Sequence, residues 1–183
     1  MNSYLTSITK QFEYYKSLGD KTFNQLTFKE LQWQSHENAN SISIIVKHIT
    51  GNMLSRWTNF LTEDGEKEWR HRDQEFKDTF TTIEDLIAAW ESGWKCLFNA
   101  ITTLTEGDLE KIIYIRNQGH TVTEAINRQL AHYAYHIGQI VFLGNLLKGN
   151  DWQSLSIPKG DSKNYNNKQF SKEKGIRYFT DDL

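Results

Sequence analysis

The chain has 183 residues, a length typical of one domain, and its 38% hydrophobic and 13% aromatic content excludes a disordered protein. A formal net charge of −2 lacks the basic field of nucleic-acid-binding proteins, and a single cysteine excludes an internal disulfide and a zinc site built from cysteines. No apolar run approaches the roughly 20 residues that span a bilayer, and the first residues do not resemble a signal peptide. The sequence therefore predicts a cytoplasmic protein without nucleic-acid or membrane partners.

Two helices are predicted in the first third of the chain, and the only proline, Pro158, lies far beyond them. Apolar side chains recur every three or four residues over 2–26, where Gly19 is expected to loosen the middle of the helix. A polar loop is expected over 32–40. The second helix is predicted over 41–61, which carries a continuous apolar stripe.

The segment 62–82 is charged with both signs and poorly periodic, and it is long for a connection between helices. Long ordered loops are often functional. Its run Trp69, Arg70, His71, Arg72 is expected to be a solvated loop anchored by the aromatic residue. The alternative is a clamp in which the two arginines bind an anionic substrate.

The third helix is predicted over 83–104, with Thr82 as its N-cap because a threonine hydroxyl can accept a hydrogen bond from a backbone N–H of the first turn. Between 105 and 120 we expect a short helical turn and an extended piece at 112–115.

The fourth helix is predicted over 122–147, where Thr121 and Glu124 have the spacing of a capping box. Four such helices joined by mixed loops predict an all-α four-helix bundle over 1–148. The remaining segment, 149–183, is polar but contains scattered aromatic residues, and we expect an extended C-terminal tail that packs on the bundle.

Three of the six histidines occupy related positions on the predicted helices. His132 and His136 lie four residues apart, which places both imidazoles on one helix face and suits chelation of one ion. At about 100° per residue they lie roughly 100–140° from the centre of their helix's apolar stripe, and His48 lies about 130° from its own. Asn52 and Arg56 lie on the same flank of their helix as His48. Each of the two helices therefore carries a line of polar residues beside its apolar stripe. Two polar lines that face each other would form a cleft, a usual place for metal sites in bundles.

The residues alone leave two interpretations of these histidines open. Three imidazoles with one open position suit a catalytic zinc, nickel, iron or copper ion. They are equally compatible with ordinary residues at the edge of the core that donate to backbone carbonyls. His36, His71 and His120 lie in polar segments and are expected to be solvated or to make local hydrogen bonds. A zincin is excluded because Tyr133 stands where its motif needs glutamate, and no Glu-x-x-His pair indicates a di-iron site.

A histidine in the second predicted helix, together with His-x-x-x-His-x-x-Gln in the fourth, resembles the DinB-like (YfiT-like) superfamily, and most closely a bacterial branch of it. The similarity lies in SISIIVKHITGNMLSRWTNFLTEDGEKEWRHRD, RQLAHYAYHIGQIVFL and LSIPKG, and it covers most of residues 1–165. The resemblance implies an up-down-down-up four-helix bundle, often a homodimer. It also implies a divalent metal site at His48, His132 and His136, with nickel or zinc as the usual ion and iron as a further possibility.

The better-understood members of this superfamily are enzymes that use a low-molecular-weight thiol, mycothiol or bacillithiol, for S-transfer or isomerisation. The resemblance therefore implies a metal-dependent thiol S-transferase, in which Asn52, Arg56 and Gln139 would orient the substrate or the ligand of the metal. The charged segment and the tail have no counterpart in those enzymes. Two alternatives remain: a metal-dependent hydrolase and a non-enzymatic, stress-linked metal-binding protein. No catalytic residue is assigned.

Overall fold

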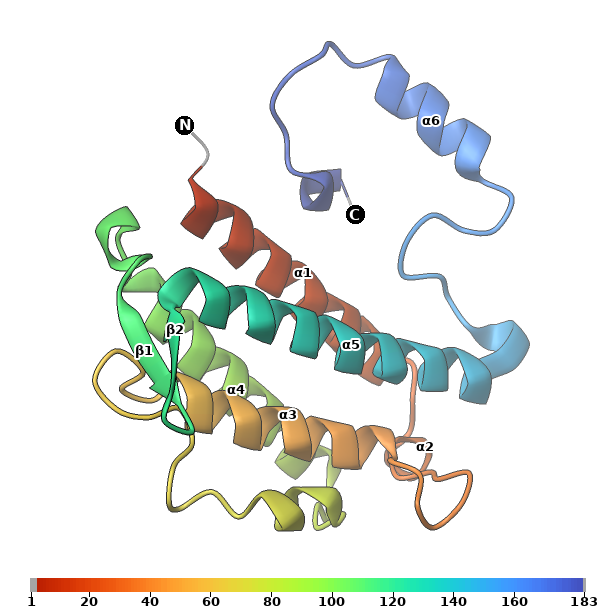
Figure 1. The fold of residues 1–183 in the computed structure, drawn as a ribbon. Helices are drawn as coiled ribbons and strands as arrows, with labels where there is room; N and C mark the ends of the chain where they lie inside the picture. The colour runs from red at the N-terminus through yellow and green to blue at the C-terminus, as the bar shows by residue number, and fades with distance from the viewer. Residues whose placement is uncertain (1–2, 183) are drawn as a thin grey trace.

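The computed structural model describes residues 3–182, so Asn2, where the first helix is predicted to begin, and residue 183 of the tail lie outside the described residues. The protein is mainly helical, as the sequence predicts. The long helices of the described part are α1 (Tyr4–Phe23), α3 (Ile42–Trp57), α4 (Ile83–Thr102) and α5 (Val122–Lys148), which pack together (Figure 1). The shorter elements are α2 (Phe28–Leu31), η1 (Arg72–Phe76), η2 (Glu106–Asp108), β1 (Ile112–Ile115), β2 (Gln118–Thr121), η3 (Gly149–Asp151), α6 (Ser162–Phe170) and η4 (Phe179–Asp182).

Aromatic side chains from different helices meet in the core. The ring of Trp94 on α4 lies 6.4 Å from that of Phe12 on α1 and 6.0 Å from that of Tyr133 on α5, measured between centroids. All three side chains are fully buried. Burying an aromatic side chain contributes a large apolar area, so this cluster ties three of the long helices together. No helix in the described part of the chain is long and apolar enough to cross a membrane.

The starts of the helices follow the predicted capping residues. The Thr82 hydroxyl accepts a hydrogen bond from the N–H of Asp85. The Thr121 hydroxyl accepts from the N–H of Glu124, and the Glu124 carboxylate accepts from the N–H of Thr121, which completes the predicted capping box.

Three helices end earlier in the chain than predicted, and α4 does so by two residues, at Thr102. The helix α1 ends at Phe23, and a separate short helix, α2, follows it inside a segment without a helix prediction. The helix α3 ends at Trp57 because Thr58 is extended and Asn59 adopts a φ of +49°, which a helix cannot accommodate.

A small hairpin closes one end of the helices. The extended piece predicted at 112–115 is strand β1, but its antiparallel partner β2 was not predicted. The turn residues Arg116 and Asn117 both have positive φ, and their backbone N–H groups donate to the Asp64 carboxylate at 2.8 Å each. The N–H of Gly65 donates to the carbonyl of Tyr114. The hairpin therefore binds the charged segment between α3 and α4.

Gly19 allows a close approach between helices, rather than loosening α1. A Cβ built on Gly19 would lie 2.5 Å from Cζ2 of Trp90, a ring that is buried and donates its indole N–H to Asp20 at 2.7 Å. We expect Gly19→Ala to lower the free energy of unfolding by about 1–3 kcal/mol through overpacking. Gly138→Ala is the matched control, because a Cβ there meets nothing within 4 Å. Gly138→Ala should instead raise the free energy of unfolding by about 0.5–1 kcal/mol, because alanine favours a helix over glycine. Urea denaturation measures both variants. An unchanged or more stable Gly19→Ala protein would contradict this packing.

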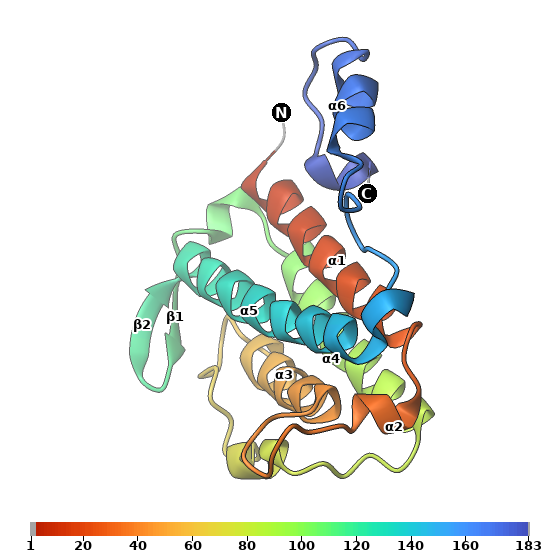
Figure 2. The ribbon, with the colours of Figure 1, turned by 90° about the vertical axis from the view of Figure 1, so that its right-hand side faces the viewer.

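The tail from residue 149 leaves the end of α5 and returns along α1, while α6 projects away from the long helices (Figures 1 and 2). Gln25 on the α1–α2 connection and Gln153 exchange two hydrogen bonds, and the ring of Phe179 lies 5.3 Å from that of Tyr14. The division into a bundle over 1–148 and a packed tail over 149–183 stays a prediction.

Candidate metal centre

Three histidines converge between α3 and α5. The Nε2 atom of His132 lies 3.4 Å from Nε2 of His48 and 3.1 Å from Nε2 of His136. One ligand atom of each of the three residues lies within 4.8 Å of the other two. His48 and His136 are buried and His132 is half-buried. The two predicted polar lines thus do face each other, and the cluster could hold a metal ion.

In two of these histidines the second ring nitrogen, Nδ1, makes a hydrogen bond outside the cluster. Nδ1 of His48 lies 2.9 Å from Oε2 of Glu75, and Nδ1 of His136 lies 2.9 Å from Oε1 of Gln139. An ionised carboxylate and an amide oxygen only accept hydrogen bonds, so each Nδ1 carries the proton and donates. In a neutral imidazole the other ring nitrogen, Nε2, then has a free lone pair. The Nε2 atoms of His48 and His136 both lie close to Nε2 of His132.

This arrangement fits a cation better than it fits a hydrogen-bond network. The Nε2 atom of His132 lies close to two lone pairs, but a neutral imidazole has only one N–H to offer. Nitrogens bound tetrahedrally at 2.0–2.1 Å would lie ~3.3 Å apart. The two Nε2–Nε2 distances given above bracket that spacing, and the ligand atoms of His48 and His136 lie within 4.8 Å of each other, so the three imidazoles could hold a divalent ion.

Burial disfavours the protonated forms of two of these imidazoles, those of His132 and His136. Desolvation, with smaller contributions from the neighbouring histidines and arginines, lowers the pKa of His132 to about 3. Desolvation also lowers the pKa of His136. Metal ions bind the neutral imidazole, so near neutral pH protons compete weakly for these two ligands.

The Glu75 carboxylate was not predicted as part of the site. It lies in η1, within the charged segment, where a role was considered for the arginines but not for this glutamate, and it is 6% exposed. Burial by itself would raise the pKa of Glu75. Hydrogen bonds from His48 and Arg70 and the charge of Arg70 outweigh burial and lower that pKa below its ordinary value. The partners lie far apart in sequence, so no spacing motif could have linked Glu75 to His48.

The interpretation of the charged segment as a solvated loop with an anchoring aromatic is wrong for two of its residues. Trp69 is 53% exposed, whereas Arg70 is 9% exposed. Nε and Nη2 of Arg70 donate to the two oxygens of Glu75 at 2.7 and 2.9 Å. The arginine is therefore the anchor, and its fork geometry matches the carboxylate.

The remaining predicted site residues bind different partners. Gln139 contacts His136, as described above. The Asn52 amide oxygen accepts from the hydroxyl of Tyr133 at 3.0 Å, and that hydroxyl accepts from the indole N–H of Trp57. Nη1 of Arg56 donates to the carbonyl of Gly65 and to Glu66. The predicted roles of Asn52, Arg56 and Gln139 toward a substrate stay predictions.

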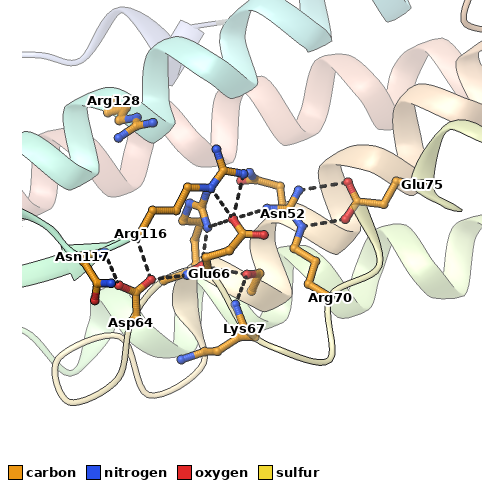
Figure 3. A network of polar contacts seen from close by, with 12 residues as sticks. Asn52, Asp64, Glu66, Lys67, Arg70, Glu75, Arg116, Asn117 and Arg128 are labelled. Carbon is orange, nitrogen blue, oxygen red and sulfur yellow. Dashed lines mark hydrogen bonds and ion pairs between the residues drawn. The ribbon is translucent and has the colours of Figure 1, made fainter. Parts of the chain in front are cut away.

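A network of ion pairs extends from Glu75 to the hairpin (Figure 3). Glu66 lies within 3.5 Å of guanidinium nitrogens of Arg56, Arg70 and Arg116. Figure 3 shows Arg70 and Glu75 turned toward each other and Glu66 close to Arg116. The network links the helix that carries His48 to the charged segment and to the hairpin.

The other histidines lie outside the cluster, as predicted. His36 and His71 are exposed, and His120 is partly exposed, with Nε2 3.4 Å from Nη1 of Arg128.

Comparison with known proteins identifies one family. A family described as "Protein of unknown function (DUF1572)" matches residues 1–161, which is most of the chain. No curated protein matches the sequence. No solved structure matches it either. The family match covers α1 to α5 and all three histidines of the cluster. The chain is a member of the DUF1572 family.

Proposed function

We propose that this protein binds one divalent metal ion, nickel, zinc or iron, through His48, His132 and His136, and that it is an enzyme of the small-thiol S-transferase kind. The observation that carries the proposal is the convergence of three Nε2 atoms, two of them on rings whose Nδ1 atoms donate to an acceptor. The resemblance to the DinB-like superfamily supports the same site and supplies the class of reaction.

The charges around the cluster favour an anionic ligand. The three imidazoles are neutral ligands, and the charges of Arg56 and Arg70 are matched by those of Glu66 and Glu75. A divalent ion would keep its full charge there. Such an ion stabilises a thiolate over a thiol, so that a small thiol is a nucleophile at neutral pH.

The neighbouring carboxylate supports a transferase over a hydrolase. A hydrolase that activates water benefits from a free general base near the ion. Both oxygens of Glu75 are occupied by Arg70, and Oε2 also accepts from His48.

The half-buried position of His132 supports an enzyme over a purely structural metal site, since a structural site is closed by protein ligands.

The direct test is turnover by the metal-loaded protein. Bacillithiol or another low-molecular-weight thiol is supplied with chlorinated aromatic or epoxide acceptors, and formation of the thioether is followed. We expect turnover that a chelator abolishes and that His48→Ala lacks. Hydrolysis of esters or amides without thiol consumption would favour the hydrolase. A stoichiometric metal without turnover on either panel would favour the non-enzymatic alternative.

We further propose the up-down-down-up order of the long helices. Contacts along the helices support it. Tyr4 contacts Asn127 and Thr22 lies beside Gly144, so α1 and α5 run in the same direction. Thr50 lies against Gly93 and Thr58 against Cys96, so α3 and α4 do as well.

We propose that α5 forms a homodimer interface. Among the described residues, the exposed large apolar side chains of the long helices are Tyr135, Phe142 and Leu146, which share one face of α5. Phe142→Glu is expected to convert a dimer into a monomer in light scattering after gel filtration. Phe170→Glu on α6, also exposed, should leave the mass unchanged. A wild-type protein that is monomeric at high concentration would contradict the proposal.

A further inference from the structure

We propose that Glu75, held by Arg70, is a positioning residue that sets the tautomer and the ring orientation of His48 at the metal centre. This inference rests on the proposed metal binding and assigns a role to the charged segment between α3 and α4, which neither the family match nor the resemblance explains.

The Glu75 carboxylate meets the Nδ1 nitrogen of His48 in a defined geometry. Oε2 accepts from Nδ1 of His48 at 2.9 Å, and the Arg70 fork holds both carboxylate oxygens from the other side. All three side chains are at most 9% exposed. A carboxylate that accepts from a histidine leaves the opposite nitrogen free for a metal and makes that nitrogen a more basic ligand.

The segment that follows Glu75 is attached to α3 at two residues that precede His48. Nζ of Lys47 donates to the carbonyl of Lys77 at 2.9 Å, and the hydroxyl of Ser43 donates to Asp78 at 2.7 Å. The ring of Phe76 stacks on the His48 imidazole, with 5.0 Å between centroids and 26° between planes. The imidazole is therefore held on its edge by Glu75 and on its face by Phe76.

Gly51 makes room for this carboxylate. It lies on α3, three residues after His48, and a Cβ built there would lie 2.8 Å from Cδ of Glu75 and closer still to Oε1. Real Cβ atoms do not approach so closely. A side chain at position 51 would push the carboxylate away from its place between Arg70 and His48.

The first experiment is made without metal. The ¹⁵N shifts of the imidazole nitrogens report which nitrogen of His48 is protonated. We expect the Nδ1–H form in the wild type and in Glu63→Gln, which alters an exposed carboxylate of the same segment that pairs with Lys67. We expect that form to be lost or mixed in Glu75→Ala combined with Arg70→Met, which removes both buried charges together. If the contact between Glu75 and His48 were merely structural, the tautomer of His48 would be unchanged in this double variant.

The second experiment measures metal binding by competition with a chromophoric chelator, using zinc, and the visible spectrum of bound cobalt. Removal of such a carboxylate typically weakens metal affinity by about 10–100-fold, and we expect this loss in the Glu75→Ala, Arg70→Met protein. Glu75→Gln retains a neutral hydrogen-bond acceptor, so its metal affinity should lie between that of the double variant and that of the wild type. Gly51→Ala, which changes no charge, should shift the affinity and the cobalt spectrum in the same direction. Gly138→Ala is its control.

The outcomes separate this inference from the proposed function. Wild-type protein that binds neither zinc nor cobalt contradicts metal binding, whatever the tautomer of His48. If the wild type binds metal but the Glu75 variants keep its tautomer, affinity and cobalt spectrum, the positioning role is wrong and the metal site stands. Weaker metal binding in Glu63→Gln or Gly138→Ala as well would show a general loss of folding and would also overturn the positioning role.

Discussion

His132→Ala is expected to reduce metal affinity by more than about 100-fold, because loss of a ligand should cost more than loss of a group that only orients one. His132 has the largest expected effect, since its Nε2 atom lies within 3.4 Å of the Nε2 atoms of both His48 and His136. Inductively coupled plasma mass spectrometry of protein purified without a histidine tag measures the bound metal. We expect close to one equivalent in the wild type and almost none in the variant.

The control for this experiment is His71→Ala, because His71 is exposed and lies outside the cluster. Metal that binds only the folded state stabilises it by about 4 kcal/mol at 1,000 times the dissociation constant. For a chain of this size that corresponds to a rise in Tm of roughly 8–16 °C. The rise should disappear in His132→Ala and persist in His71→Ala. Full metal content in His132→Ala would contradict the site.

Acidification is expected to destabilise the metal-free protein through the same residue. His132 in the unfolded chain titrates near 6.5, whereas burial holds its folded pKa at about 3. Between these two values the unfolded chain takes up a proton at His132 and the folded protein does not. The free energy of unfolding therefore falls as the pH drops from about 6.5 toward 3. The contribution of one group cannot exceed about 1.4 kcal/mol per pH unit, and partial exposure of His132 reduces it.

Urea denaturation of the metal-free protein at pH 7, 6 and 5 measures this slope. His132→Gln keeps a polar side chain that does not titrate, so its stability should depend less on pH than that of the wild type. His71→Ala should show the wild-type slope, because His71 is exposed in the folded protein. Equal slopes for His132→Gln and the wild type would show that His132 is protonated equally in the folded and unfolded states.

The histidines of the cluster differ in how far the sequence could predict their positions. His132 and His136 are four residues apart on one helix, so their spacing was enough to predict that they share a face, although not that they bind a metal. His48 could be added because its angle beside an apolar stripe follows from the same helical period. The resemblance then favoured the metal over the alternative, that these are ordinary histidines at the edge of the core.

The surroundings of the cluster depended on contacts between distant segments. Glu75 is a single carboxylate in a charged segment, and only the docking of η1 on α3 brings it to His48. The same docking buries Arg70 and exposes Trp69, the reverse of what hydrophobicity alone indicates. A buried ion pair of this kind has no sequence period, because its partners are matched by geometry rather than by spacing.

By itself the sequence determined the mainly helical class, the capping residues at Thr82 and Thr121, and the histidines that share a polar line, since all of these follow from the period of one helix and from interactions within a turn. The tertiary structure alone decided that Gly19 and Gly51 admit a ring and a carboxylate, that β1 has a partner, and that Glu75 holds His48. These features depend on the distance between chain segments that folding brings together, and a local pattern contains no such distance.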